Sequence, residues 1–442
     1  MTTLYERDAA VIAGVEKLRF FPLEVVEGRG SLLYDPDGRE LLDLSATWTA
    51  SGLGHGHPAV VEAVTRAVRT APGSGGLSAV HPDSVGLAED LLALVPGSGE
   101  RRVYFGHAGS DANDVVLRAC RNASGRRTVL AFEHSYHGGV GLAMAVSGQQ
   151  VDAGHEPDPD VVFLPYPNPL RPRTGDIDST VDEILARARE VLATDTIACL
   201  IVEPILSDGG LVVPPDGFLA RLHALCREHG VPLVCDEVKV GLGRPGLLHA
   251  FAHDGIEPDI VTFGKAIGGG LPLSAAVGPA AILDNPPASA LLTTAGNPIC
   301  TAVGRAVLRT IVEDGLPERA RIAGERLMAG LRDVQDGRGA DRGRSAERIG
   351  DVRGRGLAIG LELVAGRDGL EPDRELAQRV VYRAWQLGAV LYYVGGNVLE
   401  ITPPLIITDD EVDRAVAILD RAISDAIAGV VTKEEVAPYV GW

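Results

Sequence analysis

The sequence predicts an α/β protein with a large domain, built on a mainly parallel seven-stranded sheet flanked by helices, and a smaller α+β domain. Three observations support this fold class. The chain has 442 residues, enough for two domains that each bury a core. Short apolar segments alternate with helical patterns across residues 103–273, as expected for a parallel sheet covered on both faces. Glycine is abundant, at 54 residues, and aromatic residues make up only 5%.

The elements of the large domain follow from hydrophobic periodicity. Helical spacing over residues 5–18 and strand patterns at 25–35 and 40–44 precede it, and residues 59–69 form its first predicted helix. Further helices are expected at 111–123, 180–192 and 218–229, between the strands. The expected strands are 102–105, 128–132, 161–164, 197–202, 233–235, 260–263 and 275–278.

The C-terminal third predicts a separate, smaller domain. Helical patterns at 299–312 and 318–334 lead out of the sheet, and strands and helices then follow at 351–363, 374–387, 390–394 and 409–428. We therefore expect three segments: 1–55, which packs with the small domain; 56–305, the large domain, where a ligand would bind at the strand ends; and 306–442, the small domain.

Composition excludes several function classes. The chain carries 60 acidic and 41 basic residues, a formal net charge of −19, which disfavours binding to nucleic acids or anionic membranes. No signal peptide or membrane-spanning run is evident, so we expect a cytoplasmic protein that acts on small molecules. The five cysteines are odd in number and widely spaced, and His55 and His57 lack a third ligand nearby, so neither disulfides nor a metal site are expected.

Two residues at the ends of successive apolar runs define the expected chemistry. Asp236 ends the run that begins at Leu233, and Lys265 follows the run 261–264. Pyridoxal phosphate needs both groups, because a lysine amine forms a Schiff base with its aldehyde and a carboxylate keeps its pyridine nitrogen protonated. We interpret Lys265 as the Schiff-base residue and Asp236 as the partner of the pyridine nitrogen.

Other motifs supply the remaining contacts to this cofactor. Gly109 and Ser110 lie between a strand and a helix, where free N–H groups and a hydroxyl form an anion site, although the same pattern is an ordinary helix cap. Tyr136 follows a strand end and could cover the pyridine face, although packing is an alternative for a lone tyrosine. Thr293, shortly before Gly-Asn-Pro (296–298), could give the phosphate another hydroxyl.

The motifs occur in the order Gly-Ser-Asp-Ala-Asn (109–113), Tyr-His-Gly (136–138), Glu-Pro-Ile (203–205), Asp-Glu-Val (236–238), Phe-Gly-Lys (263–265) and Gly-Asn-Pro (296–298). This order resembles the class III aminotransferases, which are fold type I pyridoxal-phosphate enzymes, over essentially the whole chain. The resemblance implies a homodimer with active sites at the subunit interface, in which Thr293 reaches the partner subunit's phosphate. It does not settle the reaction.

Departures from the aminotransferase pattern point to a different reaction. The second acid of the usual Glu-Pro-Ile/Val-x-Gly-Glu motif is here Asp208, after a serine, and Glu400 replaces the arginine usual ahead of the Pro-Pro pair. Glutamate cannot clamp a substrate carboxylate as the arginine fork does, so the common oxo-acid acceptor loses its anchor. Lys239 stands in place of a usual glutamine beside the ring oxygen.

These departures resemble a narrower group: α-amino-ε-caprolactam racemase, amino-acid amide racemases and isoleucine 2-epimerase. In that group the tryptophan matching Trp48 contacts the substrate carbonyl, and the aspartate matching Asp208 works with the lysine matching Lys265. The alternative for Asp208 is a plain turn residue, and the alternative for Trp48 is packing.

The sequence therefore favours a racemase or epimerase that inverts the α-carbon of a lactam, an amino-acid amide or a nonpolar amino acid. Inversion needs one acid/base group on each side of the carbon, and Lys265 and Asp208 are the candidates. The alternative is an aminotransferase with an unusual donor, because a single lysine can carry the proton in transamination. A regulator that only binds the cofactor is disfavoured, because no basic helix-turn-helix pattern precedes the scaffold.

Overall fold

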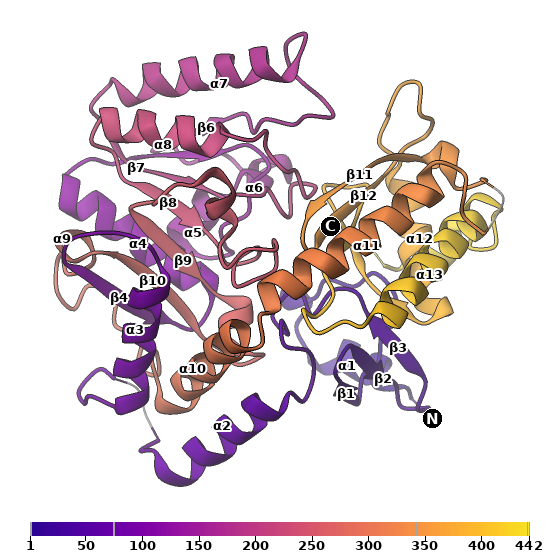
Figure 1. Ribbon diagram of the computed structural model, residues 1–442, viewed down its shortest axis with the longest axis horizontal. Coiled ribbons are helices and arrows are strands. Elements are labelled where there is room, and N and C mark those ends of the chain that lie inside the picture. Colours follow the sequence, from indigo (N-terminus) through magenta and orange to yellow (C-terminus); the bar gives the residue numbers. More distant parts are fainter. Residues whose placement is uncertain (1, 74–75, 341–342, 440, 442) are drawn as a thin grey trace. The chain divides into compact units, whose positions relative to one another are not determined.

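The computed structural model describes residues 2–73, 76–340, 343–439 and 441. The chain divides into two compact units. The large unit holds residues 48–51 and 58–318, and the small unit holds residues 1–47, 52–57 and 319–442. Helices and strands carry the labels of Figure 1. The domain boundaries expected from the sequence remain a prediction.

The large unit is built on a seven-stranded sheet with the order β4-β10-β9-β8-β7-β5-β6. Strands β6, β5, β7, β8 and β9 are mutually parallel neighbours, and β10 is antiparallel to both β9 and β4. The sheet confirms the predicted mainly parallel arrangement. The strands are β4 (Arg101–Gly106), β5 (Thr128–Phe132), β6 (Val161–Leu164), β7 (Ile197–Val202), β8 (Leu233–Asp236), β9 (Ile260–Phe263) and β10 (Ser274–Pro279).

Helices cover this sheet and explain its continuous apolar strands. Every residue of β7 is buried, as expected for a central parallel strand covered on both faces. The helix α4 packs its apolar stripe, including Val116, Leu117 and Cys120, on the sheet, whereas α7 and α8 lie side by side (Figure 1). The helices are α2 (Pro58–Thr70), α3 (Pro82–Leu94), α4 (Gly109–Ser124), α5 (Gly141–Ala145), α6 (Gly148–Asp152), α7 (Ile177–Leu192), α8 (Phe218–Glu228), η2 (Ala250–Asp254), η3 (Lys265–Gly268), α9 (Ala280–Leu283) and α10 (Pro298–Glu313).

The small unit contains two four-stranded sheets with the orders β1-β2-β3-β13 and β11-β12-β15-β14. Its first sheet joins the N-terminal segment to the C-terminal third of the chain, because β13 pairs in parallel with β3. Its strands are β1 (Glu27–Arg29), β2 (Leu32–Tyr34), β3 (Glu40–Asp43), β11 (Ile349–Arg355), β12 (Ala358–Leu363), β13 (Ala389–Val390), β14 (Tyr392–Val394) and β15 (Val398–Ile401). Its helices are α1 (Leu4–Val11), η1 (Gly14–Glu16), α11 (Leu316–Gln335), which begins before the boundary at 319, η4 (Ala346–Arg348), α12 (Arg374–Leu387), α13 (Asp409–Ile427) and α14 (Lys433–Val436).

Two predicted elements of the small unit differ in the structure. The predicted helix 5–18 is wrong beyond Val11, where α1 ends. No residue of α1 is buried, so no core packing stabilises a longer helix. The predicted strand 390–394 is split into β13 and β14, which pair in different sheets. Among the residues described, no helix is both long and apolar enough to cross a membrane.

Candidate active site

A cavity of about 370 Å³ opens in the large unit where the parallel strands end. Parallel strands deliver the loops that follow them to one edge of the sheet, so residues far apart in sequence meet there. Seven residues predicted from the sequence line this cavity, as do Glu203, His137 and the apolar segment 271–273. These seven are Gly109, Ser110, Tyr136, Asp208, Asp236, Lys239 and Lys265.

The start of α4 forms one wall through close backbone packing. A Cβ atom on Gly109 would lie 2.6 Å from a methyl carbon of Val238, so only glycine fits against the neighbouring loop. The Ser110 hydroxyl accepts a hydrogen bond from the Gly139 N–H at 3.1 Å. The 16-residue helix therefore presents its positive end and a hydroxyl to the cavity, where an anion is favoured.

Asp236 is a buried carboxylate held by three donors. Its Oδ2 atom accepts from the Asn113 side chain and from Nδ1 of His137, each at 2.8 Å, and its Oδ1 atom accepts from the Val238 N–H at 3.0 Å. Hydrogen bonds to both oxygens fix the direction of this carboxyl group. Asp236 therefore offers a preoriented negative charge to a ring nitrogen in the cavity.

Lys265 lies two residues after the end of β9 and reaches the same cavity. Its φ angle is 46°, in the left-handed region that non-glycine residues adopt at a cost, and it begins the short helix η3. Gly264 comes immediately before it, and a Cβ atom on Gly264 would lie 3.1 Å from the Gly109 backbone. Close packing of the two loops thus places the amine and the start of α4 at one cavity.

Asp208 and Lys239 form a buried ion pair beside Trp48. The Lys239 ammonium contacts Asp208 Oδ1, and both side chains are only 5% exposed. The same ammonium lies 5.1 Å from the centre of the Trp48 ring, within range of a cation–π contact. Trp48 is half-buried, does not line the cavity and packs against the Lys239 end of the pair.

Trp48 stands in an unusual backbone turn. Residues 46–49 all have positive φ angles, from 48° to 68°. A left-handed turn of this kind costs about 1–2 kcal/mol per non-glycine residue. The surrounding fold therefore offsets a strained conformation at the residue that packs against Lys239.

Tyr136 is half-buried in the loop after β5. Burial, above all, raises the pKa of its phenol; the Asp208 carboxylate raises it further and the Lys239 ammonium opposes the shift. Its backbone N–H donates to Glu203 Oε1 at 2.9 Å. The phenol therefore stays protonated beside the ion pair at neutral pH.

Thr293 lies apart from the other predicted residues. It is exposed and does not line the cavity. Its neighbour Thr294 does reach the cavity rim, because its hydroxyl lies 2.8 Å from Nε2 of His107. Within one copy of the chain, the structure does not bring Thr293 to the remaining site residues.

Sequence reasoning missed the supports behind these residues. The His137 N–H donates to the Ser147 hydroxyl, and its ring donates to Asp236. Asn113 joins His137 and Asp236 through one amide group. Their positions within the Tyr-His-Gly and Gly-Ser-Asp-Ala-Asn motifs were the available signal. Among the described residues, no group of three or more His, Cys, Asp or Glu side chains could hold a metal.

Comparison with known proteins identifies the family. Residues 13–423 match the class-III aminotransferases. The chain belongs to that family. Its fold is shared with a solved omega transaminase from Pseudomonas jessenii in complex with PMP, with a TM-score of 0.88 and 25% identity over 96% of this chain and 98% of that one.

Curated members of the family differ in reaction. The chain is 35% identical to an alanine/serine racemase from Pyrococcus horikoshii, over 98% of this chain and 92% of that protein. It is 32% identical to an isoleucine 2-epimerase from Lentilactobacillus buchneri, over 99% and 98%. It is also 35% identical to a 4-aminobutyrate aminotransferase from Mycobacterium leprae, over 95% and 94%.

The cavity fits the cofactor that this family indicates, pyridoxal phosphate. A lysine, an oriented carboxylate and a helix start with a hydroxyl converge on one cavity, matching the aldehyde, ring nitrogen and phosphate of that molecule. The chain is therefore an enzyme of the pyridoxal-phosphate family. Family membership alone leaves inversion and transamination as alternatives.

Proposed function

We propose that this enzyme is a racemase or epimerase that inverts the α-carbon of an amino-acid derivative or a nonpolar amino acid. The observation that carries the proposal is a second acid/base group, Asp208, in the same cavity as Lys265. A one-base transamination does not require that carboxylate, whereas inversion requires two groups. The relatives named as a racemase and an epimerase, matched over nearly the whole chain, support the same reaction.

Each residue has a proposed role. Lys265 would hold the cofactor covalently, Asp236 would contact its ring nitrogen, and Gly109 and Ser110 would bind its phosphate. Tyr136 would cover the ring, and Lys239 would stand beside the ring oxygen. When bound, pyridoxal phosphate supplies an electron sink that lowers the cost of removing a proton from the substrate α-carbon.

The proton transfers fall to two side chains. In the proposed reaction Lys265 Nζ removes or returns the α-proton on one face, and the Asp208 carboxylate does so on the other. One proton leaves and one arrives, so the substrate is inverted without a net change in charge. The Lys239 ammonium, in contact with Asp208, compensates the carboxylate's charge in the buried site.

The proposed substrates do not depend on an arginine that binds a carboxylate. The family's usual arginine is replaced by Glu400, and the cavity wall at 271–273 is Leu-Pro-Leu. A lactam, an amide or a nonpolar amino acid suits such a wall, with Trp48 near the substrate carbonyl. The relatives named for alanine and serine, for isoleucine, and for leucine and methionine make free amino acids the first to test.

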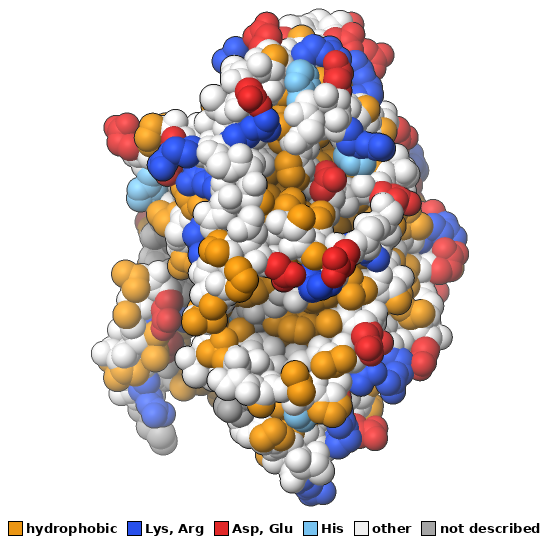
Figure 2. Space-filling view, turned by 90° about the vertical axis from the view of Figure 1, so that its left-hand side faces the viewer, with side chains coloured by type: hydrophobic (Ala, Val, Ile, Leu, Met, Phe, Trp, Pro, Cys, Tyr) orange, Lys and Arg blue, Asp and Glu red, His pale blue; other side chains and the backbone are white. Residues whose placement is uncertain are grey.

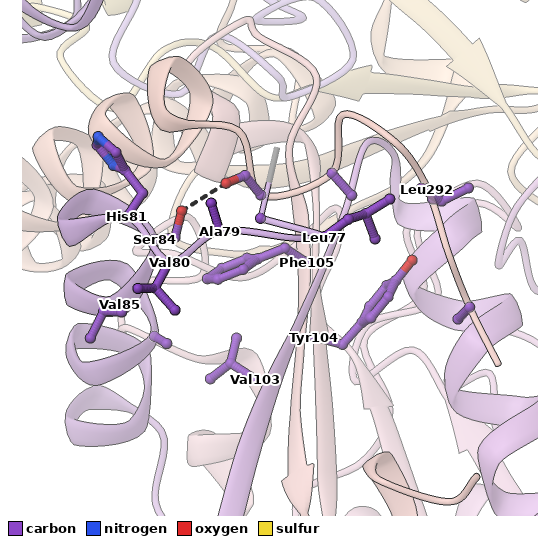
Figure 3. Close-up of a pocket in the computed structure, with 15 residues that line it drawn as sticks. Leu77, Ala79, Val80, His81, Ser84, Val85, Val103, Tyr104, Phe105 and Leu292 are labelled. Atoms are coloured by element: carbon purple, nitrogen blue, oxygen red, sulfur yellow. Dashed lines mark hydrogen bonds between the residues drawn. The ribbon is translucent and has the colours of Figure 1, made fainter. Parts of the chain in front are cut away.

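We further propose a homodimer. A second hollow of about 380 Å³ in the large unit is lined by apolar residues including Val80, which is 93% exposed, and Phe105 (Figure 3). Hydrophobic side chains also gather on the face shown in Figure 2. Residues 290, 292, 295 and 296 line this hollow, so Thr293 stands in a segment that a second copy would meet. This supports Thr293 as a donor to the partner subunit's phosphate.

One experiment separates the two reactions. Purified enzyme is incubated with single enantiomers of alanine, leucine, isoleucine, amino-acid amides and caprolactam in D₂O without an oxo acid, and chirality and α-deuterium are followed. Inversion with deuterium uptake supports the proposal. In a parallel incubation with an oxo acid added, stoichiometric conversion of that oxo acid without inversion would establish the aminotransferase instead, which the relative from Mycobacterium leprae favours. The cytoplasmic location also remains a proposal; the five buried, free cysteines suit a reducing compartment.

A further inference from the structure

Glu203 is a buried carboxylate that joins two loops of the cavity. It directly follows β7 and lines the cavity. Its Oε1 atom accepts from the Tyr136 N–H at 2.9 Å, and its Oε2 atom accepts from the Ser207 N–H at 3.1 Å and from the Ser207 hydroxyl. Glu203 thus accepts from the main chain at Tyr136, which is 67 residues before it, and at Ser207, which is four residues after it.

Each of the two loops carries a cavity residue. Tyr136 is itself in the first loop, and Asp208 directly follows Ser207 in the second. The second loop closes on itself, because the Ser207 carbonyl accepts from Gly210 and Leu211 at 3.1 and 2.8 Å. Fixing the Ser207 backbone therefore fixes the start of the Asp208 side chain.

An independent contact shows that the two loops abut. A Cβ atom on Gly209 would lie 2.5 Å from the His134 carbonyl oxygen, closer than side-chain atoms approach backbone. The loops are therefore in direct backbone contact on one side and share the Glu203 carboxylate on the other. With either contact alone, one loop could rotate against the other. The two contacts together fix the distance between the loops.

Only an ionised carboxylate satisfies this arrangement fully. Three donors point at two oxygens, whereas a glutamine would offer one oxygen and turn an NH₂ group toward the Ser207 N–H. Burial, above all, raises the Glu203 pKa, and the charges of Asp236 and Asp208 add to the effect, while His137 and the Ser207 hydroxyl oppose it. A charge kept at such a cost points to a role that an apolar or amide side chain would not fill.

We infer that Glu203 is a positioning residue that holds the Tyr136 loop against the Asp208 turn and so sets where the Asp208 carboxylate stands in the cavity. The catalytic meaning of this role rests on the proposed function, whereas the geometric part does not. Glu203 accepts main-chain donors and is not assigned any proton transfer to the substrate.

Hydrogen exchange of the complete holoenzyme tests the geometric part. In Glu203→Gln, we expect the amides of Tyr136 and Ser207 to exchange at least about tenfold faster, because each loses a charged acceptor. Glu237→Gln is the matched control, because Glu237 is another buried carboxylate that accepts two main-chain donors, from Ala250 and Phe251. That variant should change exchange at 250 and 251 and leave 136 and 207 as they are.

Isotope exchange at the substrate tests the catalytic part. Asp208→Asn should stop α-deuterium uptake from one enantiomer and leave uptake from the other. Glu203→Gln should slow uptake from that same enantiomer, by about tenfold or more, and leave the other within about twofold. A general loss of structure would slow both alike, so equal slowing would overturn the inference.

The outcomes separate the inference from the proposed function. Unchanged exchange at Tyr136 and Ser207 in Glu203→Gln would overturn the inference whatever the reaction is. Faster amide exchange, with no inversion by the wild-type enzyme, would refute the proposed function and leave the loop contact standing. If Glu203→Gln does not fold, Glu203→Asp keeps the charge on a shorter stem that cannot span both donors, and the same two readings apply to it.

Discussion

Two buried aspartates of the large unit are held in opposite ways. Asp236 is fixed by the Asn113 amide, the His137 ring and the Val238 N–H, which come from α4 and from the loops after β5 and β8. Asp208 stands in a turn and is held by the ammonium of Lys239, whose side chain is also buried. Three directed donors suit the fixed contact proposed for Asp236, whereas a single ammonium suits the proton transfers proposed for Asp208.

This difference also separates stability from chemistry. Removing Asp236 would leave three donors without their acceptor, whereas removing Asp208 would take the counter-charge away from a buried ammonium. The first residue belongs to the scaffold as well as to the cofactor site. Asp208 can be replaced by a neutral side chain of the same shape if Lys239 is replaced by a neutral one too.

The largest effect is expected for Asp236→Ala. Because three donors lose their acceptor, the free energy of unfolding of the cofactor-free protein should fall by about 3 kcal/mol or more. Inversion should become undetectable, since the ring nitrogen loses its partner. Denaturant unfolding and a chirality assay measure the two effects. Asp236→Asn keeps one acceptor and should retain most of the stability; equal loss in both variants would contradict the argument.

Next comes Asp208→Asn, which removes an acid/base group and keeps the shape. Inversion should slow by about 10²- to 10⁴-fold, the usual contribution of such a group, with pyridoxal phosphate still retained by absorbance. Asp254→Asn serves as a control, because Asp254 accepts from the backbone at the start of α8, away from the cavity. Inversion that survives in Asp208→Asn within about threefold would remove Asp208 from the reaction.

A double-mutant cycle on Asp208 and Lys239 should give a smaller, measurable coupling. Lys239→Met leaves a buried carboxylate without its cation, so the free energy of unfolding should drop by about 3 kcal/mol. Adding Asp208→Asn should recover most of that loss, because neither charge then remains. Additive losses in the cycle would show that the two side chains do not act as a pair.

The smallest effect is expected for His137→Phe. One of three donors to Asp236 is lost, and Nε2 of His137 has no hydrogen-bond partner among the described residues, so a phenyl ring replaces it at little cost there. We expect about a tenfold weaker retention of pyridoxal phosphate, followed by dialysis and absorbance, with stability nearly unchanged. If His137→Phe slowed inversion more than Asp208→Asn does, the support of Asp236 would matter more for the reaction than Asp208, contrary to the expected order.

Much of the large unit was predictable because its signals are local. Strands β5, β6, β7 and β9 have the predicted bounds, since continuous apolar runs between turn residues mark buried parallel strands. The helix predicted at 5–18 failed for the complementary reason: its periodicity had no core to pack against. Local pattern and tertiary burial agree in the sheet and disagree at the N-terminus.

The candidate site was predictable in its members and less so in its contacts. Asp236 ends β8, and Lys265 and Asp208 lie in the segments after β9 and β7; parallel strands bring such ends to one edge. The contacts of His137 and Glu203 depend on which loop abuts which, at ångström scale. No spacing in the sequence reports that the Gly209 turn touches the His134 carbonyl.

The sequence by itself determined the family, the cofactor chemistry and the positions of most strands of the large sheet along the chain, because these follow from apolar runs and from residue types placed at strand ends. Only the tertiary structure decided which carboxylate is held by three directed donors and which is paired with a buried ammonium. That choice depends on donors supplied by loops distant in the chain, and burial makes each such contact count, because a buried polar group without its partner is costly.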